Sequence, residues 1–345
     1  MKFEVRKNDL SEAIRRVLPF VGRINELADI NFVINQNELT LIARNEQSTA
    51  IKKVVIESDE DFSFALNGIE INNIVETFDK IIEFAKNENK LILKENKCKM
   101  TLVTKDISEI SNIGTELKEI DFKILKEGIK KTIDFVDDKV GVLAGINIKL
   151  QANKLITQAT NGYFGSICEF EIKNEIEKEF ILPINIAKEL IKIDSDFVGI
   201  GFKGSRVVFE FNILKIETAT ISGIYPNLGQ IFNFPLDNSL ELDKIEILNT
   251  LKKAQNIISK DKFVANFELF KDFTKISIEN QLKDLNEEIN CKYDGENKII
   301  KLNCELLPIV IKNCDDIINV RFSEKNPNAI YFKNKNNRMV LMMCS

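Results

Sequence analysis

Apolar and polar positions repeat along the chain in three successive thirds. One arrangement recurs in the segments FEVRKNDLSEAIRRV from Phe3, FKILKEGIKKTIDFV from Phe122 and LELDKIEILNTLKKA from Leu240. Each predicts a short alternating strand that runs into a helix, because its later apolar residues recur at i, i+3, i+4 and i+7. Asn8 or Asp9 is the candidate N-cap of the first helix. The expected buried stripes are Leu10, Ala13, Ile14 and Val17; Ile129, Thr132, Ile133 and Val136; and Ile247, Thr250, Leu251 and Ala254.

A second strand-to-helix pattern follows in each third, in FALNGIEINNIVETF, FILPINIAKELIKI and IKLNCELLPIVIKN. Aligned without gaps, these segments superpose Leu66, Leu182 and Leu302. Each leucine precedes Asn or Pro, which suit the turn that opens a helix. The remaining stretches alternate like strands between polar turns. Each third is therefore expected to hold two helices and about eight strands.

These repeats predict three α+β domains with boundaries at 1–114, 115–236 and 237–345. Units of about 115 residues are several times longer than ordinary solenoid repeats, so each is expected to have a core of its own. An arc of such units leaves unpaired strand edges at its two ends. Closing two arcs head to tail into a ring would remove both open edges.

Composition narrows the possible chemistry. The chain has no histidine, which excludes Ser-His-Asp and Cys-His catalysis and imidazole metal ligands. The six cysteines form no CxxC pair and are expected to be reduced apolar fillers in a cytoplasmic protein. The N-terminal segment has no apolar run typical of a signal peptide, and no membrane association is expected. The formal net charge of −5 argues against indiscriminate binding to polyanions.

Four blocks, in order, resemble the bacterial DNA polymerase III β subunit, the sliding clamp: MKFEVRKNDLSEAIRRV, LAGINIKLQANKLITQATNGYFGSI, SGIYPNLGQI and RMVLMMCS. The second is similar to a family stretch that ends in a T-D-G-H-R-L-like turn, and the third to the D-G-R-F-P-D-Y element. The resemblance covers essentially the whole chain. It implies a head-to-tail homodimeric ring of clamp domains that encircles duplex DNA and tethers a polymerase, with no catalysis, cofactor or metal.

The resemblance also implies that the two helices of each domain line the hole and carry cations on their polar faces. A negatively charged protein could then surround DNA, since its cations are sorted onto these faces. The alternative is an ordinary solvated helix face, and Glu12, Glu76, Asp134 and Glu189 dilute the basic stripes. The candidate DNA-binding residues are Arg15, Arg16, Lys80, Lys130, Lys131, Lys188, Lys192, Lys252 and Lys253 on helices, with Arg23 and Lys139 in loops.

An apolar pocket between the second and third domains is also implied, where short peptide motifs of polymerase, clamp loader and repair proteins dock. Tyr163-Phe164-Gly165 stands where the family has a more polar His-Arg-Leu pattern, so we expect a more apolar, less cationic pocket with altered peptide preference. The alternative for the C-terminal apolar run is an ordinary core strand. The candidate pocket residues are Leu143, Thr160, Gly162, Tyr163, Phe164, Gly165, Pro226, Gln230, Ile231, Asn303, Leu306, Val340, Leu341 and Met343.

Ile257 and Ile258 match an apolar pair that the family uses for ring closure, with Leu102 expected near the partner side. Core positions are the alternative for these residues. The sequence leaves two other functions open. One is a protein-interaction scaffold that does not bind DNA, and the other is a metal-dependent nuclease built on adjacent carboxylates at Asp59 to Asp61, Asp137 and Asp138, or Asp315 and Asp316.

Overall fold

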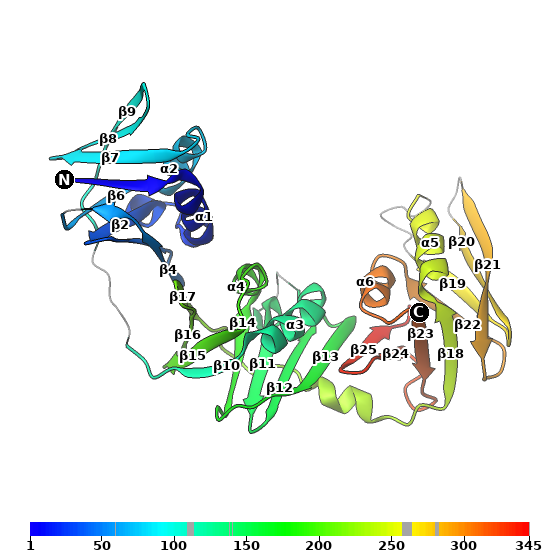
Figure 1. The fold of residues 1–345 in the computed structure, drawn as a ribbon. Coiled ribbons are helices and arrows are strands. Elements are labelled where there is room, and N and C mark those ends of the chain that lie inside the picture. Colours follow the sequence, from blue (N-terminus) through cyan, green and yellow to red (C-terminus); the bar gives the residue numbers. More distant parts are fainter. Residues whose placement is uncertain are drawn as a thin grey trace. The chain divides into compact units, whose positions relative to one another are not determined.

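The computed structural model describes residues 1–58, 60–108, 114–137, 139, 141–256, 264–279 and 283–344. Contacts divide the chain into two compact units (Figure 1). The first contains Met1–Phe122 and Ser195–Thr220, and the second contains Lys123–Asp194 and Ile221–Ser345. No helix of the described residues is long and apolar enough to cross a membrane.

The first unit contains the first third of the chain and four strands of the second. Its helices are α1 (Lys7–Val17) and α2 (Gly68–Val75), with short 3-10 turns at Leu18–Phe20 and Asn25–Ala28. The strands form a five-stranded sheet, β5-β1-β7-β8-β9, and an eight-stranded sheet, β10-β15-β16-β17-β4-β3-β2-β6. Their bounds are β1 Lys2–Arg6, β2 Asp29–Asn35, β3 Glu38–Arg44, β4 Ser48–Val55, β5 Glu57–Ser58, β6 Phe62–Asn67, β7 Ile81–Asn87, β8 Lys90–Glu95, β9 Cys98–Val103, β10 Lys118–Asp121, β15 Phe197–Lys203, β16 Arg206–Glu210 and β17 Leu214–Ala219.

The second unit contains one twelve-stranded sheet, β14-β11-β12-β13-β25-β24-β23-β18-β21-β20-β19-β22. Its helices are α3 (Phe122–Thr132), α4 (Ile184–Leu190), α5 (Lys244–Ala254) and α6 (Leu307–Lys312), with 3-10 turns at Ile133–Phe135, Gly141–Ala144 and Leu228–Asn233. Its strand bounds are β11 Gly145–Gln151, β12 Lys154–Thr160, β13 Phe164–Glu171, β14 Lys178–Pro183, β18 Asn238–Asp243, β19 Val264–Leu269, β20 Phe273–Glu279, β21 Asp284–Tyr293, β22 Lys298–Asn303, β23 Ile317–Phe322, β24 Ala329–Lys333 and β25 Asn337–Met342.

The second strand-to-helix pattern lies where the sequence predicts it. Leu66, Leu182 and Leu302 occupy matching strand positions, opposite Ile30, Ile146 and Ala265. Asn67 caps α2 by accepting the backbone N–H groups of Ile69 and Glu70, and Pro183 directly precedes α4. The Asn303 side chain caps a turn at Glu305 and Leu306, and α6 begins only after it.

The alignment predicted for the first helix of the second third is wrong by four residues. Helix α3 begins at Phe122, directly after β10, just as α1 begins at Lys7 directly after β1. Leu125 therefore corresponds to Leu10, and Ile129 corresponds to Ile14. The stripe of α1 is buried as predicted, as is that of α5. In α3 the buried positions are Phe122, Leu125, Gly128, Ile129 and Thr132.

The predicted N-cap of α1 is also wrong. The N-cap residue is Arg6, whose side chain makes no capping hydrogen bond. Strand β1 passes directly into the helix, and the Lys7 backbone N–H donates to the carbonyl of Lys80 at 2.6 Å. Asn8 and Asp9 lie inside the first turn. A main-chain group of the neighbouring loop thus replaces a side-chain cap.

Candidate functional site

A pair of adjacent cations ends the first helix of every repeat. Arg15 and Arg16 lie in the last turn of α1, Lys130 and Lys131 in that of α3, and Lys252 and Lys253 in that of α5. The pairs occupy equivalent positions, since each helix begins directly after its strand and runs for 11 residues. Cations at a helix C-terminus also complement the helix dipole. The structure thus gives the predicted basic residues a threefold regularity.

Acidic side chains hold at least one member of each pair, and in α1 they hold both, since Arg15 contacts Glu76 at 2.8 Å. Arg16 lies 2.9 Å from Glu12 and Lys131 lies 2.9 Å from Glu127, both one turn back on the same helix. Lys253 lies 2.6 Å from Glu287 on β21. Such exposed ion pairs contribute little to stability, and salt or a competing anion weakens them. These cations can exchange partners at small cost.

The second helices contribute fewer cations than predicted. Helix α2 ends at Val75 and α4 ends at Leu190, so Lys80 and Lys192 lie beyond them and not on their polar faces. Tight turns at Thr77 and Phe78 bring the chain off α2 towards β7. Lys188 is in the last turn of α4, and Lys192 contacts Glu189 at 2.7 Å. The loop cations Arg23 and Lys139 are exposed.

The predicted partner pocket falls at the junction where β13 of the second repeat pairs with β25 of the third. Phe164 faces Leu341 and Gly165 faces Val340. Thr160, at the end of β12, donates its backbone N–H to the Tyr225 hydroxyl at 3.1 Å. Burial raises the pKa of Tyr225 to about 12, so this hydroxyl is neutral at physiological pH. This bond ties the Ser222–Ile231 block to β12.

A glycine packs the same block against the 3-10 turn that carries Leu143. A Cβ at Gly223 would lie 2.4 Å from the Val142 side chain, and its φ of +131° disfavours other residues. Leu143 is half-buried in this turn. Leu143, Thr160 and Pro226 thus lie in one region, because Gly223 packs against Val142 and Tyr225 accepts a hydrogen bond from Thr160.

The candidate pocket residues occupy two faces of the β13–β25 junction. Phe164 and Leu341 face the core beneath the helices, where the Phe164 ring lies 4.8 Å from that of Phe135. Val340 faces the other side, where Ile231 packs with Tyr331. The residues that remain at least partly exposed are Leu143, Gly162, Tyr163, Pro226, Gln230, Ile231, Asn303, Leu306 and Met343.

The C-terminal apolar run is mostly a core strand. Met339, Val340 and Leu341 are buried, whereas Met342 is 37% exposed and Met343 is half-buried. The Met342 backbone N–H donates to the carbonyl of Tyr163, which is 68% exposed. The alternative of a core strand therefore holds for most of the run, and only its end, beside Tyr163, offers apolar surface.

Sequence reasoning missed three residues of this region. Tyr225 lies inside the SGIYPNLGQI block, so the sequence carries a signal for it. The Phe232 ring packs against Tyr331, and the Arg338 guanidinium lies 5.2 Å from the Phe232 ring centroid while also pairing with Glu169. Arg338 therefore places a positive charge on the face of the junction that carries Val340 and Phe232, although the sequence predicted a less cationic pocket.

The edge residue Leu102 lies on β9, the last strand of its sheet, and is half-buried. Ile257 and Ile258 lie outside the described residues. In the third repeat, Asp284 to Asn290 of β21 pair with β20 on one side, and among the described strands only residues near Cys291 reach β18 on the other. Strands β9 and β21 therefore each present an open edge.

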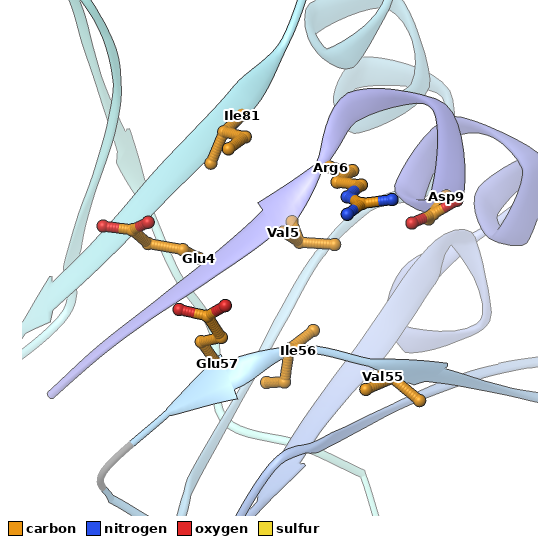
Figure 2. A pocket seen from close by; sticks show the side chains of 8 residues that line it. All are labelled: Glu4, Val5, Arg6, Asp9, Val55, Ile56, Glu57 and Ile81. Atoms are coloured by element: carbon orange, nitrogen blue, oxygen red, sulfur yellow. The ribbon is translucent and has the colours of Figure 1, made fainter.

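A separate hollow of about 350 Å³ lies in the first unit, between β1, the start of α1, β5 and β7 (Figure 2). Figure 2 shows the Arg6 guanidinium beside Asp9, and Glu4 and Glu57 on adjacent strands at the other side. Three carboxylates against one guanidinium disfavour an anionic ligand. The hollow contains none of the predicted functional residues.

The described residues contain no cluster of three or more side chains suited to hold a metal ion. Of the carboxylates weighed for such a site, Asp315 and Asp316 are exposed, while Asp59 and Asp138 lie outside the described residues. Burial raises the pKa of the Cys168 thiol to about 11 and those of Cys304 and Cys314 to about 12. These cysteines are poor nucleophiles and ligands, as expected of apolar fillers.

Comparisons with known proteins agree on one family. The family model of the DNA polymerase III beta subunit, central domain, matches residues 116–227. The beta sliding clamps of Mycoplasma pneumoniae and Staphylococcus epidermidis are 22% and 24% identical to this chain over 94% and 93% of both chains, respectively.

Solved structures agree with the sequence matches. The DNA polymerase III subunit beta of Pseudomonas aeruginosa matches with a TM-score of 0.91 at 18% identity, covering 100% of both chains. The Bacillus subtilis sliding clamp matches with a TM-score of 0.92 at 17% identity, covering 100% of this chain and 99% of that one. A Pseudomonas clamp bound to griselimycin also gives 0.92, with the same coverage. The predicted fold, three α+β clamp domains of antiparallel sheets and helices, is confirmed.

Proposed function

Because this chain is a distant homologue of the beta sliding clamps over nearly its whole length, we propose that it acts as a processivity factor. Two copies close head to tail into a ring around duplex DNA and tether a replicative polymerase and other partners through short peptide motifs. The family is non-enzymatic, in agreement with a chain that lacks histidine. The three repeats delimited by 1–114, 115–236 and 237–345 are its clamp domains.

The threefold recurrence of the basic helix ends carries the proposal. Equivalent positions in α1, α3 and α5 present two adjacent cations each, although the chain has a net charge of −5. Contacts between cations and phosphates carry no sequence information and are readily exchanged. Enclosure of the duplex then supplies the persistence on DNA, and the cations need only weak contacts that allow sliding.

Charge reversal tests this role. The double variant Lys131→Glu/Lys192→Glu should lose retention on nicked circular DNA at moderate salt while keeping its thermal unfolding midpoint. The matched control Lys173→Glu/Lys203→Glu reverses two exposed charges outside the predicted DNA-binding set and should be retained like the parent. Equal retention of the two variants across salt concentrations would contradict the proposal. Normal peptide binding by a parent protein that never associates with DNA would favour the scaffold function instead.

The two internal junctions of the sheets support ring closure by strand pairing. Ser48 faces Thr218 where β4 meets β17, and Phe164 faces Leu341 where β13 meets β25. Hairpin registers show that Ser48 and Phe164 are equivalent, as are Thr218 and Leu341. The two junctions therefore share one register.

Of these equivalent strands, only β9 and residues 284–290 of β21 lack such a neighbour among the described residues. By the hairpin registers, Lys283 is the counterpart of Ser48, and Leu102 is the counterpart of Thr218. Transferring the shared register joins β9 of one copy to β21 of the other. The proposed facing residues are Cys98 with Glu287, Lys99 with Asn286, Met100 with Leu285, Thr101 with Asp284 and Leu102 with Lys283.

Charges at the two open edges are complementary, which further supports their pairing. The turn into β9 and β9 itself carry Lys97 and Lys99, whereas β21 carries Asp284 and Glu288. In the transferred register, Lys97 faces Glu288. Opposite charges across antiparallel strands favour one register over its shifted alternatives. This pairing includes Leu102 of the interface proposed from the sequence, whereas Ile257 and Ile258 of that interface lie outside the described residues.

For the partner pocket, we propose that a peptide places its apolar anchors against the exposed end of β25 and the segments around it. Tyr163, Leu306 and Met343 supply accessible apolar surface there, and a flexible methionine suits several side chains. Met343→Ala should weaken a peptide that contains Gln, Leu and Phe about tenfold, because about 1.4 kcal/mol of contact is lost. Titration with and without griselimycin, which binds a Pseudomonas relative, would test the site; unchanged affinity in the variant would contradict it.

A further inference from the structure

Glu76 ties the two helices of the first repeat together. It is the residue after α2, and its carboxylate accepts from Arg15 Nη2 at 2.8 Å, from Lys7 Nζ at 3.1 Å and from the Ser11 hydroxyl. All three donors belong to α1. These hydrogen bonds, that of Ser11 foremost, lower the pKa of Glu76 to about 2. Glu76 is therefore negatively charged at neutral pH, beside a predicted DNA-binding cation.

The other two repeats have a lysine at this position. Asn67, Pro183 and Asn303 end equivalent strands, and the residues nine positions further on are Glu76, Lys192 and Lys312. Both lysines are exposed, and Lys192 also contacts Glu189 at 2.7 Å. At the same structural position the first repeat thus has a negative charge, and the second and third have a positive one.

The second and third repeats also connect their two helices in a different way. Lys126 of α3 donates to the main-chain carbonyl of Ile193, just beyond α4. Lys244 of α5 donates to the carbonyls of Lys312, at 3.1 Å, and Cys314, at the end of α6. Main-chain carbonyls satisfy the lysine without adding a charged group. The first repeat makes the same helix-to-helix connection with a carboxylate, which neutralises cations of α1.

We propose that Glu76 occupies the place of a DNA phosphate on the first repeat and weakens its contact with the duplex. Glu76 already occupies one N–H group of Arg15, whose side chain is 65% exposed, and its carboxylate repels a phosphate that approaches the others. The second and third repeats, with lysine at this position, then hold most of the DNA. The inference rests on the proposed function. It adds that the Glu76 carboxylate competes with DNA phosphates for the cations of α1 and lowers the affinity of the first repeat for DNA.

The test compares Glu76→Lys and Glu76→Gln with the control Glu70→Lys, which makes the same charge reversal at an exposed position in the first turn of α2. Binding of the full-length protein to a duplex oligonucleotide is measured across salt concentrations. Glu76→Lys should tighten binding about tenfold at low salt and steepen the dependence of log K on log salt by about one unit per protomer. Glu76→Gln should give a smaller change in the same direction, and Glu70→Lys should leave the slope unchanged.

Equal slopes for Glu76→Lys and Glu70→Lys, or a Glu76→Lys slope equal to that of the parent, would overturn the inference while leaving the proposed function intact. A parent protein without salt-dependent DNA binding would overturn both. Glu76→Gln guards against loss of structure, because an amide oxygen can still accept from Ser11. If Glu76→Lys unfolds, an unchanged slope for Glu76→Gln overturns the inference.

Discussion

Equivalent strands are paired at the closed junctions, β17 with β4 and β25 with β13, but have no neighbour within the described part of the chain at the open edges on β9 and β21. Where β17 meets β4 and β25 meets β13, the inward-facing Ile216 and Met339 are 1% and 0% exposed. Their counterpart on the open edge β9 is Met100, which is half-buried, and Leu285 on β21 is likewise half-buried. The open edges carry apolar residues at the positions that a neighbouring strand covers elsewhere in the chain.

This difference indicates that the open edges are suited to pairing. An unpaired edge with exposed apolar residues is an aggregation hazard unless a specific partner covers it. At the internal junctions the partner belongs to the same chain. At β9 and β21, the shared register and complementary charges favour the complementary edge of a second copy. Stability should therefore depend on the closed junctions, and assembly on the open edges.

Truncating a buried side chain at a closed junction should give the largest decrease in the free energy of unfolding. Phe164→Ala removes a ring that is 4% exposed and packs against Phe135, so the free energy of unfolding should fall by about 3–5 kcal/mol. Leu102→Ala, at the open edge, should cost about 1 kcal/mol in the monomer. Urea denaturation followed by circular dichroism measures both. Equal losses would erase the distinction between the two kinds of edge.

A charge at the open edge should break assembly and leave the fold intact. Met100→Asp would bury a carboxylate opposite Leu285 in the closed ring, and we expect the dissociation constant of the dimer to rise by at least about 100-fold, equivalent to about 2.7 kcal/mol. Light scattering over a concentration series measures this change. The control Val103→Asp lies on the opposite face of β9, where the side chain is 71% exposed, and should remain dimeric. Dimers of normal affinity in Met100→Asp would contradict the edge assignment.

The smallest expected effect comes from the charged pair that fixes the register. Glu288→Lys should raise the dimer dissociation constant about threefold at low salt, because an exposed ion pair contributes about 0.2–1 kcal/mol. Adding Lys97→Glu should restore the affinity, and 1 M salt should remove the difference. Sedimentation of the single and double variants provides the comparison. Failure of the second substitution to compensate would argue for another register.

Much of the fold was predictable because strand alternation and turn residues are local signals. The match of Leu66, Leu182 and Leu302 was correct for this reason. The first-helix alignment failed because a shift of four residues is nearly one helical turn and preserves an apolar stripe. Periodicity therefore aligned Ile129 with Leu10, whereas the start of α3 directly after β10 makes Leu125 the counterpart of Leu10.

The functional surfaces were less predictable because they depend on contacts between distant residues. The basic helix ends were visible in the sequence, but the bond between Arg15 and Glu76 joins residues 61 positions apart. The bond between Thr160 and Tyr225 likewise spans 65 positions. Burial of Leu341 also depends on its pairing with Phe164, which no local pattern specifies.

A disulfide across the proposed ring interface tests the central claim most directly. Cys98 is exposed, and its counterparts Leu214 and Asn337 face Lys52 and Cys168 at the closed junctions. The neighbouring pairs are hydrogen-bonded, since Lys53 donates its backbone N–H to Ile213 and Glu169 donates to Asn336. Both facing pairs are therefore of the non-hydrogen-bonded type, in which the two Cα atoms are about 4.5 Å apart, within disulfide range. In the proposed ring, Cys98 faces Glu287.

We predict that Glu287→Cys, oxidised in the otherwise natural chain, forms a covalent dimer that runs as a closed circle with two disulfides. The dimer should remain on circular DNA in high salt and slide off linear DNA. Cys98→Ser should abolish the cross-link, and Glu288→Cys, on the opposite face of β21, should cross-link far less. Absence of the cross-link in Glu287→Cys, or equal cross-linking in Glu288→Cys, would contradict the account.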